Sequence, residues 1–485
     1  MTLSHEAHPE RRTKILITLG PATDSPETME KLISAGINCV RVNFSHGSHA
    51  DHQKRIELVR TTAKKLNRVI GVLGDLQGPK IRIANFKEGK IHLRSGDPFI
   101  LDAAMDSDAG THSAVGIDYK ELPNDVVAGD ILLLNDGLLT FRVEKIEGAR
   151  ILCRVIQGGE LSNHKGINKK GGGLTAKALT EKDLEDLIFA VKMEVDYLAI
   201  SFPRNADDIH YARKLIQDAK GNCGIIAKIE RTEAVVAIDD IINASDGVMV
   251  ARGDLAVEIG DAEVPMVQKH IIQRARTLDK PVIIATQMME SMIHSPVPTR
   301  AEVSDVANAV LDHVDCVMCS AETATGQFPL ETVQAMDRTC RVVELQPKTQ
   351  QSKHRVECEF KRIDEAIAMA AIYTANHFAM RAVVALTESG ATPLWMSRIR
   401  TGLPIYGLSR FNRTLGKMTL YHGVYPIFFD VTHCTRDNLN QKAIELLEEK
   451  KLLQKKDRVI LTKGDHLGRS GGSNAMKILV VGEVL

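Results

Sequence analysis

The sequence predicts an α/β protein: a (β/α)8 TIM barrel with an inserted small β-barrel lid domain and a C-terminal open α/β sheet domain. Three observations support this prediction. Short apolar runs ending in polar residues alternate with helical segments about eight times, the order expected of a (β/α)8 barrel. Strand-like segments joined by glycine-containing turns interrupt that alternation once. A second series of apolar runs and helices follows, which is typical of an open sheet.

The changes in pattern suggest where each domain lies. We expect the barrel domain at 1–79 and 178–350, the inserted lid domain at 80–177 and the open α/β sheet domain at 351–485. A chain of 485 residues exceeds what a single core usually organises. The three consecutive glycines at 171–173, where the lid ends, are typical of a hinge or lid connection, although a flexible loop has the same composition.

Composition and charge narrow the class of protein. The 62 basic and 62 acidic residues cancel, so neither nucleic acid nor membrane is expected as a partner. The polar segment 1–12 has no apolar signal core, and no run reaches the roughly 18 apolar residues of a membrane span, so a cytoplasmic location is expected. Eight scattered cysteines predict free thiols. Cys316 and Cys319 face opposite sides of a predicted strand, which disfavours a zinc or redox pair.

The stretch 224–260 carries the strongest functional signal, since it reads as strand, helix, strand and helix start. Lys228 and Glu230 share one face at the end of the first strand. The second strand ends in Arg-Gly-Asp at 252–254, where backbone N–H groups of the new helix can hold an anion. Glu230 and Asp254 offer hard oxygen ligands for a magnesium-like ion. A lone Lys-x-Glu pair is usually a solvated ion pair, but strand ends are where such folds place their chemistry.

Polar residues also end the other predicted barrel strands. One such cluster is usually a turn or a helix cap, but repetition at successive strand ends favours a site. These strand-end residues are Arg41, Asn43, Ser45, His46, Asp75, Ser201, Thr286, Ser320 and Glu322.

Two loops of the C-terminal domain could hold a phosphate. The segments 387–392 and 462–474 follow predicted strands and contain hydroxyl groups, and the first leads into a helix. Hydroxyls and N–H groups at a helix start suit a phosphate. Ordinary turn chemistry explains the same residues equally well.

Several motifs then carry a resemblance to a known family. RVNFSHG, DLQGPKIR, KGIN, AISFPR, AKIE, MVARGDL, ATQMMESM and SAET occur in this order, and from about Lys14 to the C-terminus the chain resembles pyruvate kinase. The resemblance implies a barrel interrupted by a lid, a C-terminal regulatory domain and a homotetramer. It also implies that phosphoenolpyruvate transfers its phosphoryl group to ADP, giving ATP and pyruvate.

The resemblance also implies residue roles. Lys228 would hold the transferring phosphoryl group and then the enolate oxygen, and Mg²⁺ or Mn²⁺ would bind Glu230 and Asp254. Gly253, Asp254 and Thr286 would hold the carboxylate of pyruvate. The remaining implied roles are substrate binding for Ser201 and Arg41, ordering of the proton-donating water for Thr286 with Ser320, and nucleotide binding for Asn43, His46, Arg82 and Lys165.

No G-x-x-x-x-G-K-[ST] motif occurs, so the nucleotide must be held in another way. Closure of the lid over the barrel would serve this purpose and would also exclude water.

The chain departs from the family pattern at the potassium site. In many members that ion is bound at positions equivalent to Asn43, Ser45, Asp75 and a threonine, with a nearby glutamate. Here Leu76 replaces the threonine and Lys80 replaces the glutamate. An ammonium group can stand in place of the ion and repels a second cation. We therefore expect activity without potassium.

The effector loop departs as well. Glu388 and Ala391 stand where members activated by sugar bisphosphates commonly carry basic residues. Thr387, Ser389 and Thr392 could still hold one phosphate. The expected activator is therefore a sugar or nucleoside monophosphate.

Two other classes of function fit parts of the pattern. A divalent-metal pyruvate aldolase would use a similar barrel and the Glu/Asp pair, but would need neither the lid nor Lys228. A metabolite sensor without catalysis could share the scaffold, although every charged position of the predicted site holds a competent residue.

Overall fold

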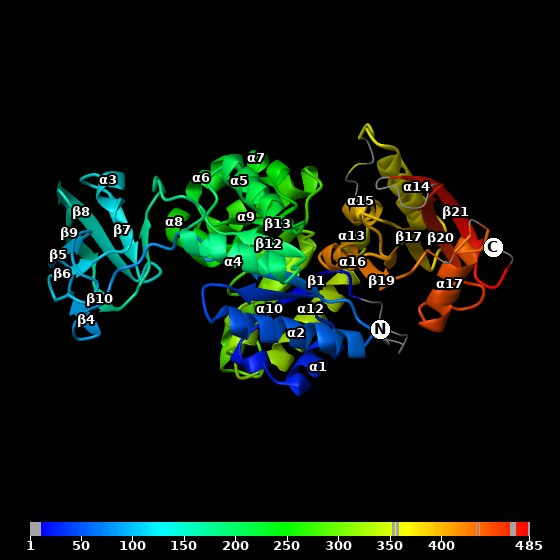
Figure 1. Ribbon diagram of the computed structural model, residues 1–485, viewed down its shortest axis with the longest axis horizontal. Helices are drawn as coiled ribbons and strands as arrows, with labels where there is room; N and C mark the ends of the chain where they lie inside the picture. The colour runs from blue at the N-terminus through cyan, green and yellow to red at the C-terminus, as the bar shows by residue number, and fades with distance from the viewer. Residues whose placement is uncertain are drawn as a thin grey trace.

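The computed structural model describes residues 11–351, 355, 358–432, 434–435, 437–465 and 472–483. Three lobes lie in a row, with the lid at one end, the barrel in the middle and the C-terminal domain at the other end (Figure 1). Within these ranges, none of the helices combines the length and the apolar character that a membrane crossing needs. Most of the polar segment 1–12 lies outside the described residues, as does 466–471 of the second predicted phosphate loop.

Eight parallel strands close into the predicted barrel, in the order β1-β16-β15-β14-β13-β12-β3-β2. All of them are short and almost entirely buried, because helices cover the outside and apolar side chains fill the inside. Their bounds are β1 (Lys14–Thr18), β2 (Cys39–Asn43), β3 (Gly71–Asp75), β12 (Tyr197–Ile200), β13 (Gly224–Ile229), β14 (Gly247–Ala251), β15 (Val282–Ala285) and β16 (Cys316–Cys319).

The barrel helices begin where the sequence supplies caps. Ser48, Thr180 and Thr299 each accept a backbone N–H in the first turn and complete a capping box. The apolar faces of the helices pack against the strands in one continuous core. The helices are η1 (Pro21–Thr23), α1 (Pro26–Ser34), α2 (His49–Lys65), α4 (Glu181–Lys192), α5 (Ala206–Asp218), α6 (Thr232–Val236), α7 (Ile238–Ala244), α8 (Arg252–Ile259), α9 (Val264–Thr277), η2 (Glu290–Ile293), α10 (Arg300–Leu311), α11 (Ala321–Ala324) and α12 (Pro329–Glu344).

The lid is a small β domain with its own apolar core. A six-stranded sheet has the order β11-β7-β8-β9-β5-β6, and β10 pairs with β4. The segment 81–84 bonds near both outer edges of this sheet, through Ile83 N–H to Lys165 O (2.9 Å), just before β11, and through Ala84 N–H to Gly116 O (2.8 Å) in β6. The elements are β4 (Lys90–Leu93), β5 (Pro98–Asp102), β6 (Ala114–Gly116), α3 (Leu122–Asp125), β7 (Ile131–Leu134), β8 (Leu139–Glu147), β9 (Arg150–Gln157), β10 (Gly159–Ser162) and β11 (Ile167–Lys169).

The three glycines that follow β11 are held in place. Their φ angles are 85°, 79° and 90°, the left-handed region that favours glycine. Gly171 N–H donates to the Glu258 carbonyl (3.2 Å), and Gly173 N–H donates to the Glu233 carboxylate. Of the two interpretations of this segment, a hinge anchored to the barrel fits these contacts better than a loose loop.

The C-terminal domain is an open α/β sheet, as predicted, with the order β19-β18-β17-β20-β21. β21 runs antiparallel to β20, whereas the other neighbouring pairs of this sheet are parallel. The elements are α13 (Pro347–Gln350), α14 (Ile363–His377), β17 (Ala382–Leu386), α15 (Ala391–Ile399), β18 (Ile405–Ser409), α16 (Asn412–Met418), β19 (Val424–Phe428), α17 (Leu439–Glu449), β20 (Arg458–Gly464) and β21 (Ser473–Val480).

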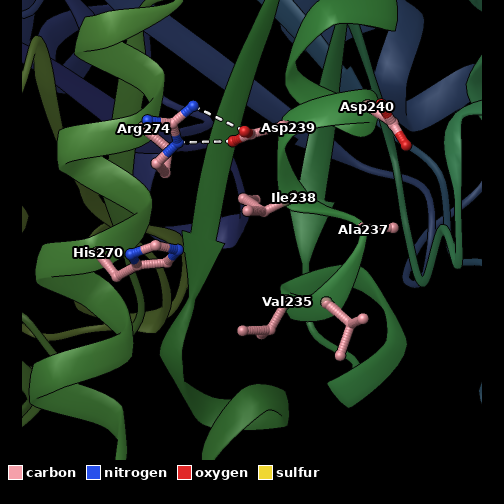
Figure 2. Close-up of a pocket in the computed structure, with 8 residues that line it drawn as sticks. Val235, Ala237, Ile238, Asp239, Asp240, His270 and Arg274 are labelled. Carbon is pink, nitrogen blue, oxygen red and sulfur yellow. Dashed lines mark hydrogen bonds and ion pairs between the residues drawn. The ribbon is translucent and has the colours of Figure 1, made fainter.

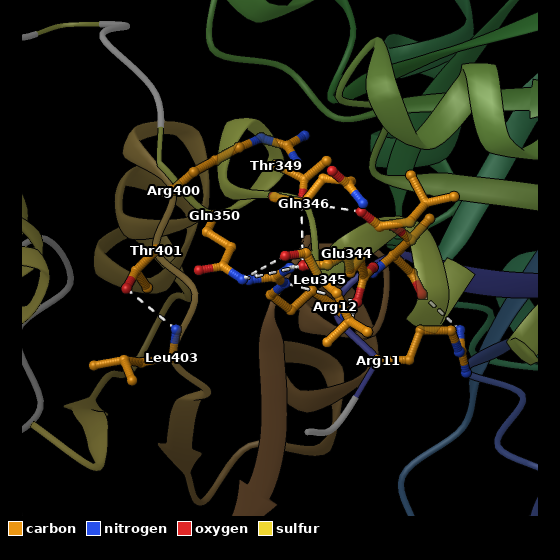
Figure 3. Close-up of polar contacts among 12 residues, drawn as sticks. Arg11, Arg12, Glu344, Leu345, Gln346, Thr349, Gln350, Arg400, Thr401 and Leu403 are labelled. Carbon is orange, nitrogen blue, oxygen red and sulfur yellow. Dashed lines mark hydrogen bonds and ion pairs between the residues drawn. The ribbon is translucent and has the colours of Figure 1, made fainter. Parts of the chain in front are cut away.

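Buried polar groups join this domain to the N-terminal end of the barrel. Within the barrel, the Glu344 carboxylate accepts the Arg12 and Thr13 N–H groups at 2.8 and 2.6 Å (Figure 3). Arg400 of the C-terminal domain donates to Val314 O at 3.3 Å, shortly before β16. Arg398 forms a fully buried ion pair with Asp315, the residue that precedes β16. The end of the barrel opposite the predicted site is therefore fastened by paired charges.

All eight cysteines are free thiols, as predicted. Cys316 and Cys319 are both buried in β16, where burial raises the pKa of each thiol. They therefore behave as core residues.

Candidate active site

Charged side chains from β2, β3 and β13 meet the Ser201 hydroxyl, which follows β12, at the C-terminal end of the barrel. The centre is Asp75 at the end of β3, whose carboxylate lies 2.5 Å from Arg41 Nε and 3.3 Å from Lys228 Nζ. Lys228 Nζ lies 2.9 Å from Glu230 Oε1 and donates to Ser201 Oγ at 2.7 Å. Lys228 and Glu230 thus converge, as their alternation along β13 predicts.

Mutual pairing keeps this cluster ionised. Burial acts to raise the pKa of Asp75, but Arg41 and Lys228 outweigh it, and the pKa is lower than usual. Burial acts to lower the pKa of Lys228, but Asp75 and Glu230 hold it above its ordinary value. The structure therefore maintains a permanent ammonium in a nearly dry site.

Glu230 and Asp254 form a pair of carboxylates suited to a divalent ion. Burial raises the pKa of Glu230; Lys228 opposes this shift, and the nearby charge of Asp254 adds to it. Glu230 Oε2 accepts the Phe202 N–H (2.8 Å), while the buried Oε1 has no hydrogen bond within the described residues and faces only the Lys228 ammonium.

No cluster of three or more His, Cys, Asp or Glu suited to a metal occurs in the part of the chain that the structure describes. Two carboxylates are what Mg²⁺ commonly uses, with water and substrate oxygens completing its shell. The residues present therefore fit such an ion, which Glu230 and Asp254 would hold.

The turn after β15 is strained and firmly supported. Thr286 and Gln287 have φ angles of 66° and 55°, unusual for residues with side chains. Arg252 donates to Thr286 O (2.6 Å) and pairs with Asp305 (2.7 Å), and Gly253 N–H donates to Thr286 Oγ1 (2.9 Å). The carboxylate-binding residues implied by resemblance thus lie together, at the start of α8.

Ser320 lies beyond β16 with its hydroxyl oxygen buried and without a hydrogen bond among the described residues. Its backbone N–H donates to Glu322 (2.6 Å), whose other oxygen accepts the Met289 N–H at 3.2 Å. An unpartnered hydroxyl in a buried polar position suits an ordered water.

Lys80 forms an ion pair with Asp254. Its Nζ is 3.4 Å from Asp254 Oδ1, and it makes no recorded contact with Asn43, Ser45 or Asp75 in the described structure. Asp75 is already neutralised by Arg41 and Lys228, which explains why it does not draw a third cation. Asn43 Oδ1 instead accepts the Ser45 N–H (3.2 Å) in the turn after β2.

The residues expected on the nucleotide side are less organised. His46 is exposed, and Arg82 and Lys165 lie on neighbouring segments of the lid edge. Across the described ranges, their side chains make no recorded contact with the strand-end cluster. Their role in nucleotide binding remains a prediction.

Sequence reasoning assigned no role to Thr18 and Arg252. Thr18 Oγ1 accepts from Arg41 (3.2 Å) and donates to Cys319 O (2.9 Å), so it links β1, β2 and β16. Arg252 supports a turn more than thirty positions away. The only available signal was their location at strand ends.

In the C-terminal domain, the predicted phosphate loop surrounds the start of α15. Thr387 Oγ1 accepts the Gly390 N–H (2.9 Å), and Ser389 is exposed. Thr392 is buried and donates to Ser473 (2.7 Å), so its hydroxyl faces the protein. Glu388 lies 3.6 Å from Arg410, which offsets its charge.

A surface pocket of about 260 Å³ lies outside the barrel, among α6, α7 and α9 (Figure 2). Its charged residues include Arg274 and Asp239, which already satisfy one another at 2.6 and 2.7 Å. None of the predicted site residues lines it.

Comparison with known families agrees with this geometry. A family model described as the barrel domain of pyruvate kinase matches residues 10–333, and the model of its alpha/beta domain matches 365–479. The chain belongs to the pyruvate kinase family. Pyruvate kinase II of Salmonella typhimurium is 54% identical over 477 residues, 97% of this chain and 99% of the relative. The pyruvate kinase of Haemophilus influenzae is 55% identical over 458 residues, 94% and 96% of the two chains. That of Sporosarcina psychrophila is 42% identical, covering 98% of this chain and 81% of the relative.

As a member of the pyruvate kinase family, the protein is a phosphotransferase. Phosphoryl transfer depends mainly on positioned charge, since the transition state spreads negative charge over the moving group. The cluster of Arg41, Lys228 and two candidate metal carboxylates has the composition that this reaction needs.

Proposed function

We propose that the protein transfers the phosphoryl group of phosphoenolpyruvate to ADP, giving ATP and pyruvate, in the last step of glycolysis in the cytoplasm. The observation that carries this proposal is the buried Lys228 ammonium, held between Asp75 and Glu230 and bonded to Ser201. A fixed cation in a nearly dry pocket stabilises the charge of a phosphoryl group far better than one in water.

Each step of the proposed reaction is assigned to groups of the site. Lys228 and Arg41 hold the phosphoryl oxygens, and Lys228 then holds the enolate oxygen of the product. The N–H groups of Gly253 and Asp254, with the Thr286 hydroxyl, bind the substrate carboxylate at the start of α8. Ser320, with Thr286, orders the water that delivers a proton to the enolate carbon. Mg²⁺ or Mn²⁺ at Glu230 and Asp254 supplies further positive charge to the substrate oxygens.

Nucleotide binding is assigned to the mouth of the site. Asn43 and His46 approach it from the barrel, and Arg82 and Lys165 approach it from the lid. Because Arg82 and Lys165 belong to the lid, closure would bring both cations toward the phosphates of ADP and exclude water.

Activity without potassium is part of the proposal. Leu76 brings no hydroxyl to the cation site, and Lys80 brings an ammonium group to the same rim of the barrel. The test is the initial rate of pyruvate formation from phosphoenolpyruvate and ADP with saturating Mg²⁺, before and after adding potassium. We expect fast turnover in both. Strong potassium stimulation would refute the cation substitution, and no turnover in either would favour the aldolase or sensor alternative.

Regulation is assigned to the loop before α15. A sugar or nucleoside monophosphate would place its phosphate against Thr387, Ser389 and the N–H groups of that helix start, with Thr392 beneath them. Arg410, paired only loosely with Glu388, could turn toward it. We expect Ser389→Asp to abolish activation by AMP or ribose 5-phosphate and to spare the basal rate. Unchanged activation by both compounds in this variant would contradict the assignment.

We also propose a homotetramer. Exposed apolar side chains on the outside of the barrel, Met266 of α9 and Val297 before α10, support contact between copies. Light scattering should give a mass about four times the 53.3 kDa of one chain.

A further inference from the structure

Lys80 carries a cation from the base of the lid to a carboxylate of the barrel. Its Nζ lies 3.4 Å from Oδ1 of Asp254, in the first turn of α8. Its side chain passes close to Gly166, where an added Cβ would lie 3.6 Å from Lys80 Cε. Gly166 bridges to Arg82 and directly precedes β11, so it belongs to the edge of the lid. The ion pair therefore spans the boundary between lid and barrel.

Within the described residues, neither Lys80 nor Asp254 has a second ion-pair partner. Among the described residues, Asp254 is the single carboxylate within ion-pair distance of Lys80, and Lys80 is the single cation within that distance of Asp254. The side chains are 34% and 26% exposed, so water can replace either partner at little cost. The contact is thus one that a stronger ligand of Asp254 can break.

We propose that the Lys80 ammonium and the divalent ion compete for Oδ1 of Asp254, so that metal binding releases the Lys80 contact across the lid boundary. This inference rests on the proposed function, in which Asp254 is a metal ligand. An ammonium and a divalent cation repel one another when they share one carboxylate oxygen. Lys80 is then a positioning residue that neutralises Asp254 before the metal arrives and becomes free to turn afterwards.

The other connection of the lid would not respond in this way. Gly171 N–H donates to the carbonyl oxygen of Glu258, which also lies on α8, through an uncharged backbone hydrogen bond at 3.2 Å. The Lys80 and Gly171 contacts both reach α8, and Gly173 N–H is held by the Glu233 carboxylate of α6, which is not a proposed metal ligand. Metal binding should loosen one side of the lid attachment and leave the other side intact.

The first test measures Mn²⁺ affinity without substrates, from the free-ion signal in electron paramagnetic resonance. We expect Lys80→Met to bind Mn²⁺ about two- to five-fold more tightly than the unaltered protein, the range for a partly exposed ion pair. Lys170→Met removes the same charge from an exposed position near the end of the lid and should bind as the unaltered protein does. Unchanged or weaker binding by Lys80→Met would overturn the proposal.

The second test follows Lys80 itself. Acetylation by acetic anhydride, quantified by mass spectrometry, reports how freely each lysine reacts. We expect saturating Mn²⁺ to speed the labelling of Lys80 several-fold, because the amine loses its carboxylate partner, and to leave Lys170 unchanged. Equal or slower labelling of Lys80 with Mn²⁺ would contradict the competition.

The Asp254→Asn variant tests whether Asp254 binds the metal at all, separately from its competition with Lys80. Loss of Mn²⁺ binding in this variant, combined with unaltered affinity in Lys80→Met, would refute the competition and keep Asp254 as a ligand. Unaltered Mn²⁺ affinity in Asp254→Asn would refute the metal assignment, and the competition with it.

Discussion

Buried polar and charged groups are paired differently at the two ends of the barrel. At the N-terminal end, both carboxylate oxygens of Asp315 receive hydrogen bonds, from Arg398 (3.0 Å), Val282 N–H (3.0 Å) and His422 N–H (3.2 Å). At the C-terminal end, Ser320 Oγ is buried without a hydrogen bond in the described structure, and the ion-pair partner of Glu230 Oε1 is the Lys228 ammonium, 2.9 Å away. Buried charges with a full set of hydrogen bonds hold the two domains together. Buried polar atoms that lack hydrogen-bond partners remain available to bind a substrate and a metal.

The largest expected effect is a loss of stability, and it arises at the N-terminal end of the barrel. Asp315→Ala should lower the free energy of unfolding by about 3–5 kcal/mol, because it leaves the Arg398 guanidinium buried without its partner. Thermal or urea unfolding measures this change. The control is Asp239→Ala, which breaks the exposed pair with Arg274 and should cost at most about 1 kcal/mol. Equal losses in the two variants would remove the distinction between paired buried charge and surface charge.

The next effect concerns catalysis rather than stability. Lys228→Met should lower kcat/KM for phosphoenolpyruvate by about 10²-fold or more, because the phosphoryl group and enolate lose their fixed cation. Asp75 keeps its contact with Arg41, so the fold should persist, and circular dichroism provides that control. Turnover close to that of the unaltered protein would contradict the role of Lys228 and favour a pyruvate aldolase.

A smaller effect should appear in the pH dependence of stability. Glu258 is buried near the hinge of the lid, and this burial raises its pKa to about 7 from an ordinary 4.5. The Glu258 carboxyl binds its proton more tightly in the folded protein than in the unfolded chain. The resulting stabilisation of the folded state is complete below about pH 4.5 and is lost as pH rises through 7.

Glu258→Gln keeps an acceptor for the Thr232 N–H and cannot ionise. We expect its unfolding free energy to gain about 2 to 3 kcal/mol relative to the unaltered protein between pH 5 and 8. Urea unfolding at several pH values measures the difference. The exposed Glu449→Gln should leave the profile unchanged. Parallel profiles for Glu258→Gln and the unaltered protein would show that the carboxyl of Glu258 is not held neutral.

The sequence predicts the parts of the site that depend on local periodicity. Alternation along one strand is enough to bring Lys228 beside Glu230, and an apolar run ending in a polar residue is enough to place Asp75 at the rim. The order of eight strand and helix units likewise predicts the barrel, because that fold repeats one local pattern.

Contacts between distant positions could not be predicted in this way. Lys80 and Asp254 are 174 positions apart, and local spacing does not indicate which carboxylate a lysine will reach. The support of the Thr286 turn by Arg252, 34 positions away, has no local signature either. The segment 81–84 joins the edges of the lid sheet through isolated bridges rather than as a strand with its own alternation. Each of these features follows from how separate elements pack.

The glycine segment that returns the chain from the lid also limits how this protein can evolve. A side chain at 171, 172 or 173 would meet left-handed backbone, and a Cβ at Gly172 would lie 2.7 Å from Glu233 Oε1, the atom that holds Gly173. Surface positions of the lid can accept many substitutions, whereas replacing any of these three glycines strains the connection between lid and barrel. Mutational tolerance should therefore fall sharply between β11 and the barrel, and a saturation library of the lid would show a narrow intolerant band there.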